Sequence, residues 1–200
     1  AIAGVINIIL KEQTDVFALS GSFHPTLAGD GREINLHSNY GLSFKNGGFV
    51  HISSEIMMRE AYNRAGNYTG NVYDSNDSID AILIAQNDFW SKVPYKDQRV
   101  MQIGSGSMFN ANTFANVSVP MKGNGEFYAN GGLSYRQGKA NGFYRFPYQE
   151  EKVETAFYPH GFSPEIQTDI QDNSLTMGMR NEKNGWLMDF SVSTGSNSLN

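Results

Sequence analysis

The sequence has no cysteine, few charged residues and no long apolar run. Without cysteine it has no disulfide framework, no thiolate metal site and no cysteine nucleophile. Charged residues make up 18% of the 200 residues, and the net charge of -5 lacks the basic excess of a nucleic-acid-binding protein. The longest apolar run, residues 1–10, is too short for a transmembrane helix and is interrupted by Gly4 and Asn7. These absences exclude a helical membrane bundle, and we expect no nucleic-acid partner.

Glycine and aromatic residues are abundant, and both suit strands and turns better than helices. Side chains alternate between apolar and polar with period two, most clearly over residues 33–44. One face of this segment contains Ile34, Leu36, Ser38, Tyr40, Leu42 and Phe44, and the other contains Glu33, Asn35, His37, Asn39, Gly41 and Ser43. The same pattern predicts strands over residues 16–23, 33–44, 49–60, 109–119, 126–136, 174–180 and 186–193.

The connections between the predicted strands alternate between long and short. We expect the first, third and fifth to be long, with about ten, fifty and thirty-five residues, and the others to be turns of about three to five residues. Outer-membrane barrels have this rhythm, with long extracellular loops and short periplasmic turns. The predicted fold class is therefore all-β: an antiparallel transmembrane β-barrel fragment with about seven wall strands.

Charge and aromatic placement agree with a lipid-facing wall. No Asp, Glu, Lys or Arg falls on the apolar face of the predicted strands. Phe44, Phe127 and Trp186 lie on that face beside short turns, where an interfacial girdle is expected. The commoner source of alternating strands is a soluble sandwich or lipocalin-like barrel, in which the apolar faces are buried inside.

The turn at residues 46–48 predicts a register for the hairpin that contains it. We expect Phe44 to pair with Val50 and Leu42 with Ile52 on the lipid side. On the other side we expect a lumen lined by charged residues. These are Glu55, Arg59, Glu126, Arg136, Arg180 and Asp189. Hydrogen bonding to a plug and to neighbouring strands is the favoured role for them, ahead of substrate contact.

Four stretches resemble the TonB-dependent receptors, the energised import channels of Gram-negative outer membranes. The first three are residues 1–11 (AIAGVINIILK), 131–147 (from GGLSYRQG to ANGFYRFP) and 158–166 (YPHGFSPEI). The fourth begins with residues 184–191 (NGWLMDFS) and ends with residues 195–200 (GSNSLN). The first resembles the last strand of the family's internal plug. Residues 61–100 have no such match.

The resemblance implies domains, partners and a location. Residues 1–12 would be the end of the plug domain, and residues 13–200 an incomplete N-terminal part of the barrel. Because the chain begins with alanine inside an apolar stretch, we expect a fragment of a longer protein. The parent would lie in the bacterial outer membrane among its lipids and engage the TonB complex. It would import a small-molecule or metal-chelate substrate, most often an iron–siderophore complex. No catalytic residue and no cofactor is implied. The alternatives are a passive porin or structural barrel, and a soluble ligand-binding β-domain.

The long loops hold the remaining candidates. Aromatic residues that could contact substrate are Tyr62, Tyr68, Tyr73, Trp90, Tyr95, Tyr144 and Tyr148, and packing among the loops is an equal alternative. Asp74, Asn76, Ser78 and Asp80 alternate oxygen side chains as at the start of a calcium loop. That motif is weak, because the usual Gly and Glu are replaced by Ile79 and Ala85. A short helix is expected from Ser78 to about Asn87, capped by Asp77 or Ser78.

Overall fold

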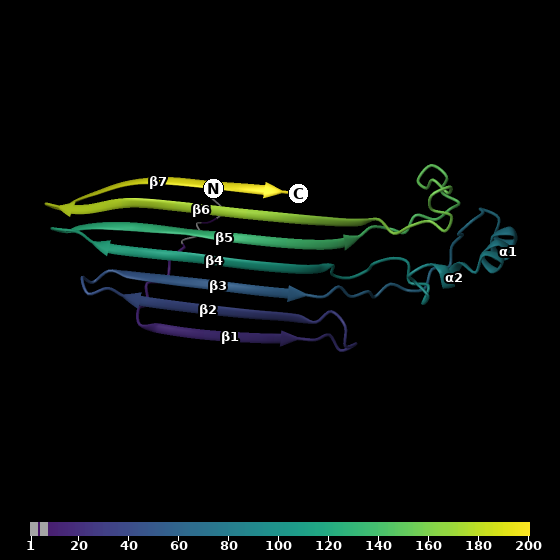
Figure 1. The fold of residues 1–200 in the computed structure, drawn as a ribbon, viewed down its shortest axis with the longest axis horizontal. Coiled ribbons are helices and arrows are strands. Elements are labelled where there is room, and N and C mark those ends of the chain that lie inside the picture. Colours follow the sequence, from purple (N-terminus) through teal and green to yellow (C-terminus); the bar gives the residue numbers. More distant parts are fainter. Residues whose placement is uncertain (1–3, 5–7) are drawn as a thin grey trace.

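The computed structural model describes residue 4 and residues 8–200, and its architecture is a single antiparallel sheet. Strands account for 50% of the chain and helices for 8%, which confirms the all-β prediction. The seven strands lie side by side in chain order, in one open layer (Figure 1). They are β1 (Val16–His24), β2 (Glu33–Ser43), β3 (Phe49–Arg59), β4 (Ser107–Pro120), β5 (Gly125–Asn141), β6 (Glu165–Lys183) and β7 (Trp186–Leu199).

The connections confirm the predicted alternation of long and short. Residues 44–48, 121–124 and 184–185 turn the chain at one end of the sheet. Residues 25–32, 60–106 and 142–164 form longer loops at the other end, where Figure 1 places both helices, α1 (Asp77–Asn87) and α2 (Phe89–Lys92). None of the helices in the described part of the chain is long and apolar enough to cross a membrane.

Three strands extend well beyond the sequence pattern, and one of them is β7, which continues to Leu199. β5 continues to Asn141 and β6 begins at Glu165, so the loop between them is shorter than expected. Lys139 and Asp169 lie in these extensions, and their alternation puts them on the same side as the apolar residues of β5 and β6. The absence of charge on that side therefore holds for the part of the strands near the short turns and not for the extensions. Alternating polarity could not reveal these extensions, because polar residues occupy the apolar face there and, on β6, Ile166 and Ile170 occupy the polar face.

The predicted register of the β2–β3 hairpin is wrong by two residues. Leu42 pairs with Val50, and Tyr40 with Ile52. The Phe44 N–H donates to the Gly48 carbonyl at 2.7 Å, which leaves a three-residue loop. Gly47 has φ 86° there, the left-handed conformation that such a loop requires. A two-residue shift keeps every side chain on its predicted face.

The predicted helix is present, but its cap lies one residue earlier than expected. The Asn76 side chain accepts the N–H groups of Ser78 and Ile79, so Asn76 is the N-cap of α1. Asp88, with φ 48°, ends α1 in the left-handed conformation. The short helix α2 follows it at once and was not predicted, because four residues are too few for a helical period.

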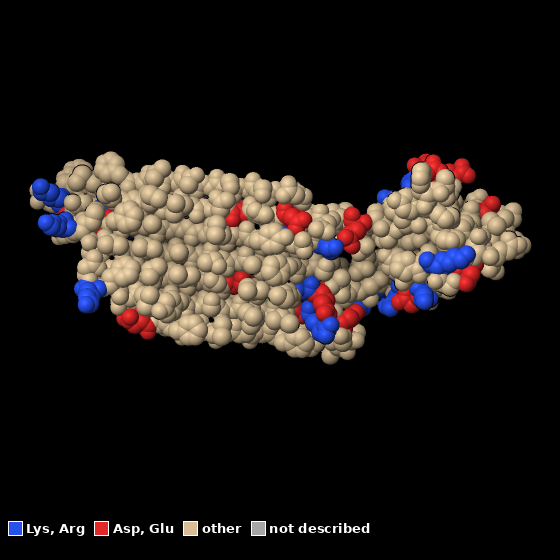
Figure 2. All heavy atoms as spheres, in the orientation of Figure 1, with Lys and Arg blue, Asp and Glu red and all other residues tan. Residues whose placement is uncertain are grey.

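The two faces of the sheet differ in polarity along every strand. The register places most of the apolar side chains of all seven strands on the same face. Side chains on this apolar face are exposed, including Phe17, Leu19, Leu36, Phe190 and Trp186. Polar exceptions on it are paired, as where the hydroxyls of Ser54 and Thr113 lie 3.0 Å apart. Figure 2 shows one view of the molecule, on which Lys, Arg, Asp and Glu are sparse along the middle of the strands.

On the polar face, two aromatic side chains lie over glycines of the neighbouring strand. A Cβ atom added to Gly132 would lie 2.9 Å from the Phe114 ring, and one added to Gly178 would lie 2.6 Å from the Tyr128 ring. A glycine beside an aromatic residue lets the ring cover the backbone of the next strand. These contacts help to fix the pairing of β4 with β5 and of β5 with β6.

Gly132→Ala should therefore destabilise the sheet. The added methyl group would overlap the Phe114 ring, at a cost of about 1–3 kcal/mol. Guanidinium unfolding in detergent, followed by tryptophan fluorescence, measures the change. Gly66→Ala is the matched control, because nothing lies within 4 Å of a Cβ atom at Gly66. Equal midpoints for the two variants would contradict the proposed role of the ring.

Candidate functional site

The six charged residues expected to line a lumen all lie on the polar face. Strand alternation and register place Glu55, Arg59, Glu126, Arg136, Arg180 and Asp189 there together. This face also carries an open cavity of about 710 Å³. Its lining is rich in hydroxyl, amide and carboxylate groups, such as those of Asn112, Ser134 and Asp172. The polar face is therefore a hydrated surface suited to hydrogen bonding.

Three of the six residues bond to other strands of the sheet, and Asp189 on β7 does so across β6. The Arg180 guanidinium lies 2.5 Å from the Glu126 carboxylate, which also accepts the Ser118 hydroxyl at 2.6 Å. The Tyr128 hydroxyl donates to Asp189 at 2.7 Å. These bonds favour the structural role that was preferred for these residues over substrate contact.

The other three residues have fewer polar contacts with the rest of the sheet. Glu55 lies 3.8 Å from the His37 ring nitrogen, and both side chains are partly exposed. The Arg59 Nε is buried without a hydrogen-bond partner among the described residues. For the Arg136 side chain, the described residues provide no ion pair.

A segment that precedes β1 crosses the polar face without pairing as a strand. We call residues 8–14 the strap. The Lys11 ammonium donates to Asn39 at 2.9 Å, and the Asn116 amide donates to the Lys11 carbonyl at 3.1 Å. Gly41 permits this close approach, because a Cβ atom there would lie 2.0 Å from the Gln13 carbonyl oxygen. Half of the predicted end of the plug, residues 1–12, lies outside the described residues, which include only residue 4 and residues 8–12 of it.

Strand alternation places His51 on the polar face, but nothing in the sequence indicates its contact with the strap. His51 is 2% exposed, and its Nε2 is buried without a hydrogen-bond partner among the described residues. It lines a cavity of about 180 Å³ together with Leu10, Lys11 and Asn116. Asn39 and Asn116, which hold the strap, are separated from Lys11 by many residues, so no local signal identifies the contact.

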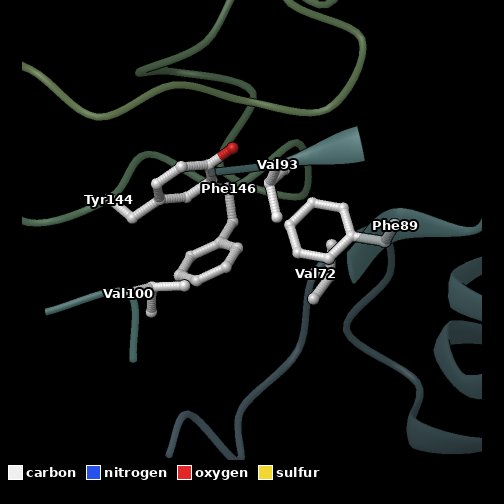
Figure 3. Close-up of a cluster of buried hydrophobic side chains, with 6 residues drawn as sticks. All are labelled: Val72, Phe89, Val93, Val100, Tyr144 and Phe146. Carbon is white, nitrogen blue, oxygen red and sulfur yellow. The ribbon is translucent and has the colours of Figure 1, made fainter. Parts of the chain in front are cut away.

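The two longest loops pack together into one unit with its own apolar core. Residues 60–106 and 142–164 form this loop unit, and Figure 3 shows the side chains at its centre. They are Val72, Phe89, Val93, Val100, Tyr144 and Phe146. Phe89 meets the rings of Tyr73, Trp90 and Tyr144 edge to face. This core lies beyond the sheet, at its long-loop end (Figure 1).

Most of the aromatic substrate candidates belong to this core. Tyr144 is part of it, and Tyr68, Tyr73, Trp90 and Tyr95 pack against it. The alternative of packing among the loops therefore describes these five residues. Tyr148 lies at the rim, 38% exposed and stacked on Phe146. Tyr62 lies apart, against Gly31 and Gly104, with the Arg64 guanidinium 5.0 Å from its ring centre.

Tyrosine hydroxyls link the two loops. The Tyr73 hydroxyl lies 2.6 Å from His160 Nδ1, and the Tyr95 hydroxyl donates to Ser163 at 2.9 Å. The Tyr144 hydroxyl donates to the His160 carbonyl at 2.9 Å. Burial, with a smaller effect of Lys92, lowers the pKa of His160. The imidazole is therefore held more firmly in its neutral form than a solvated histidine.

Three of the four candidate calcium ligands accept backbone N–H groups, and the fourth, Ser78, donates its own N–H to Asn76. Asp80 is 4% exposed, and its carboxylate accepts the N–H groups of Val72, Tyr73 and Asp74. Asn76 caps α1, and Asp74 accepts the Asn76 N–H at 2.7 Å. Within the described chain, no group of three or more His, Cys, Asp or Glu is arranged to hold a metal ion. The oxygen-rich pattern is explained by turn and helix capping.

Ion pairs join the first long loop to the base of the loop unit. The Arg64 guanidinium binds both carboxylate oxygens of Asp30, at 2.7 and 2.6 Å. That guanidinium, with the Thr26 hydroxyl, holds the pKa of the Asp30 carboxyl well below its usual range. These groups are exposed, so solvent screening limits their contribution to stability.

Alkaline titration should separate the buried tyrosines from the rest. Burial raises the pKa values of Tyr68, Tyr73 and Tyr144 to about 12. Because the folded-state pKa is raised, the stability linked to each phenol is present below about pH 10 and is lost as pH rises toward 12. Absorbance near 295 nm should show a late phase that becomes smaller in Tyr144→Phe. In urea all tyrosines should titrate near 10. A folded protein whose titration matches the one in urea would contradict the burial of these phenols.

The geometry provides two chemically distinct regions. One is a polar sheet face crossed by the strap, and the other is an aromatic loop unit beyond one end of the strands. Among the described residues, neither region contains a group of three or more His, Cys, Asp or Glu arranged to hold a metal ion. Comparison with models of protein families, with curated proteins and with solved structures finds no match.

Proposed function

We propose that this chain is part of the wall of an outer-membrane active transporter that resembles the TonB-dependent receptors. The parent protein would import a scarce nutrient, in the usual case an iron–siderophore complex, with energy delivered through the TonB complex. In this proposal the apolar face of the sheet contacts lipid and the polar face lines the lumen. The strap would connect the wall to a plug, and the loop unit would lie outside the cell.

The observation that most directly supports this proposal concerns the exposed apolar side chains on the apolar face, which form a band. This band runs diagonally across the rows of residues that pair from strand to strand. On β2 the band covers Ile34 to Leu42, and on β7 it covers Trp186 to Val192. One row of partners joins Leu42, Val50, Val117, Ala129, Met177 and Val192. Leu42 is the end of the band nearest the short turns, whereas Val192 is the end nearest the long loops. The band therefore moves toward the short turns from one edge of the sheet to the other.

The size of this displacement matches a tilted transmembrane wall. From β1 to β7 the midpoint of the band moves about eight residues, or about 26 Å at about 3.3 Å per residue. The strand spacings between them, each about 4.8 Å, add up to about 29 Å. The ratio of the displacement along the strands to the distance across them corresponds to a strand tilt of about 42°. Barrel strands tilt by about 35–45° in outer membranes. A flat lipid layer requires this geometry, because its apolar slab cuts across tilted strands.

Aromatic residues at both margins of the band support the same proposal. Phe127 and Trp186 lie near the short turns, and Phe109 and Tyr135 pack together toward the long loops. From Phe127 to Tyr135 the band spans about nine residues, and a tilted membrane-spanning strand needs about 9–11. Aromatic girdles at both interfaces are a feature of outer-membrane barrels.

The two alternatives fit these observations less well. A soluble β-domain requires the apolar faces to be buried inside, whereas the apolar face of this sheet is exposed. A passive porin leaves its polar face open to water. Here the strap occupies part of that face through Lys11 and covers His51. This placement favours a plugged channel.

Cysteine labelling in the membrane tests the wall and its tilt. Leu36, Ile56 and Ser198 share one hydrogen-bonded row of the sheet. The diagonal band predicts that Cys at position 36 or 56 reacts with a lipid-soluble maleimide, and that Ser198→Cys reacts with a membrane-impermeant one. The chain has no cysteine, so each label reports one position. Glu55→Cys, on the opposite face from Ile56, is the control for lumen access. If Leu36→Cys and Ser198→Cys react alike, the transmembrane wall is refuted.

Uptake of radioactive iron by intact cells tests the transport itself. Cells that contain the full-length protein should accumulate ferric siderophore complexes only while TonB is present and the inner membrane is energised. Deleting the protein should remove this uptake. Uptake that persists without TonB would instead indicate a passive channel. No uptake of any tested chelate, with the wall confirmed by labelling, would refute the proposed substrate class and leave the wall in place.

A further inference from the structure

An open cleft lies between the two halves of the loop unit, separate from the cavity on the polar face. Its volume is about 330 Å³, and small-molecule sites start at about 300 Å³. Tyr68, Val100 and Met101 of the first loop line one side of it, and seven residues between 143 and 152 of the second loop line the other. The two loops are fixed to each other here, since the Tyr148 N–H donates to the Val72 carbonyl at 3.0 Å. The cleft is thus a preformed feature of the folded loops.

Aromatic rings form much of the cleft wall. Phe146 is stacked on Tyr68, with ring centres 4.2 Å apart and planes 17° apart. Tyr148 also lies nearly parallel to Phe146, with a ring centre 6.3 Å from that of Phe146. Phe143 and Tyr148 are 65% and 38% exposed, so both offer accessible ring surface. This arrangement suits a flat aromatic group, which stacks at an offset or edge-to-face on such rings.

The charges that line the cleft are all positive. They belong to Arg145 and Lys152, and no carboxylate is among the described residues of the lining. The Arg145 backbone is held by Phe162 on both its N–H and its carbonyl, at 2.8 and 3.1 Å. Its guanidinium has no ion-pair partner within the described chain. Lys152 lies 3.4 Å from Glu151 at the surface. An arginine fixed at its backbone, with a free guanidinium, is suited to bidentate binding of a carboxylate.

We propose that this cleft binds a planar aromatic anion, with the aromatic carboxylates as the ligand class. The ring would stack against Tyr148 and Phe143, and the carboxylate would accept two hydrogen bonds from Arg145. Lys152 would add attraction at the rim. The proposal does not depend on transport, because binding is read directly on solubilised protein.

The test is calorimetric titration of the full-length protein in detergent with 2-naphthoate. Neutral 2-naphthamide separates the contribution of charge from that of stacking. Arg145→Gln should weaken 2-naphthoate about tenfold and leave 2-naphthamide unchanged, because it removes a charge-assisted bidentate contact. Tyr148→Ala should weaken both ligands. Lys96→Gln, which removes an exposed positive charge of the same loop unit outside the cleft, should change neither.

Equal affinity of wild type and Arg145→Gln for 2-naphthoate would overturn the proposal. Equal binding of 2-naphthoate and 2-naphthamide by the wild type would overturn it as well. Near-ultraviolet circular dichroism of the aromatic core checks that each variant is folded. If Arg145→Gln alters that spectrum, Arg145→Lys replaces it. That variant keeps the charge but loses the bidentate geometry, so weaker binding of 2-naphthoate is again required.

Discussion

Backbone hydrogen bonds between neighbouring strands hold each side chain of the sheet on one of two faces, and the rest of the structure depends on this constraint. Because side chains alternate, each strand can present its apolar residues on one side only if its register matches that of its neighbours. The register does so across all seven strands. The result is a sheet whose apolar face has no partner within the described chain. Such a surface is stable only when it is covered, and in the proposed function lipid would cover it.

The polar face is stabilised by hydrogen bonds between its own side chains. Its hydroxyl, amide and charged groups bond across strands, as Glu126 does with Arg180, so few depend on contacts outside the sheet. The strap adds contacts through Lys11 that are side-chain and carbonyl bonds, without a strand ladder. A segment held in this way separates from the sheet at less cost than a paired strand, because no row of backbone bonds has to break. That property suits a connection between a fixed wall and a movable plug.

The loop unit has a core because its chain is long enough to bury apolar side chains of its own. Phe89, Tyr144 and Phe146 come from two loops that are distant in sequence, and their burial fixes both loops. Asp80 stabilises the turn before α1 by accepting three backbone N–H groups that would otherwise lack partners. The two loops are therefore held against each other, and the cleft beside Arg145 lies between them.

The sequence alone determined the strands, the face on which each side chain lies, and the alternation of long loops with short turns. It could do so because period-two polarity and turn residues are local signals. It did not determine the register of Leu42 with Val50, since a shift of two residues leaves both faces unchanged. The extensions of β5 and β6, the contact of Lys11 with Asn39, and the burial of Tyr68 and Tyr73 in a loop core were decided only by the tertiary structure. Each of these depends on which distant segments meet, and the free energy of such contacts leaves no local pattern in the chain.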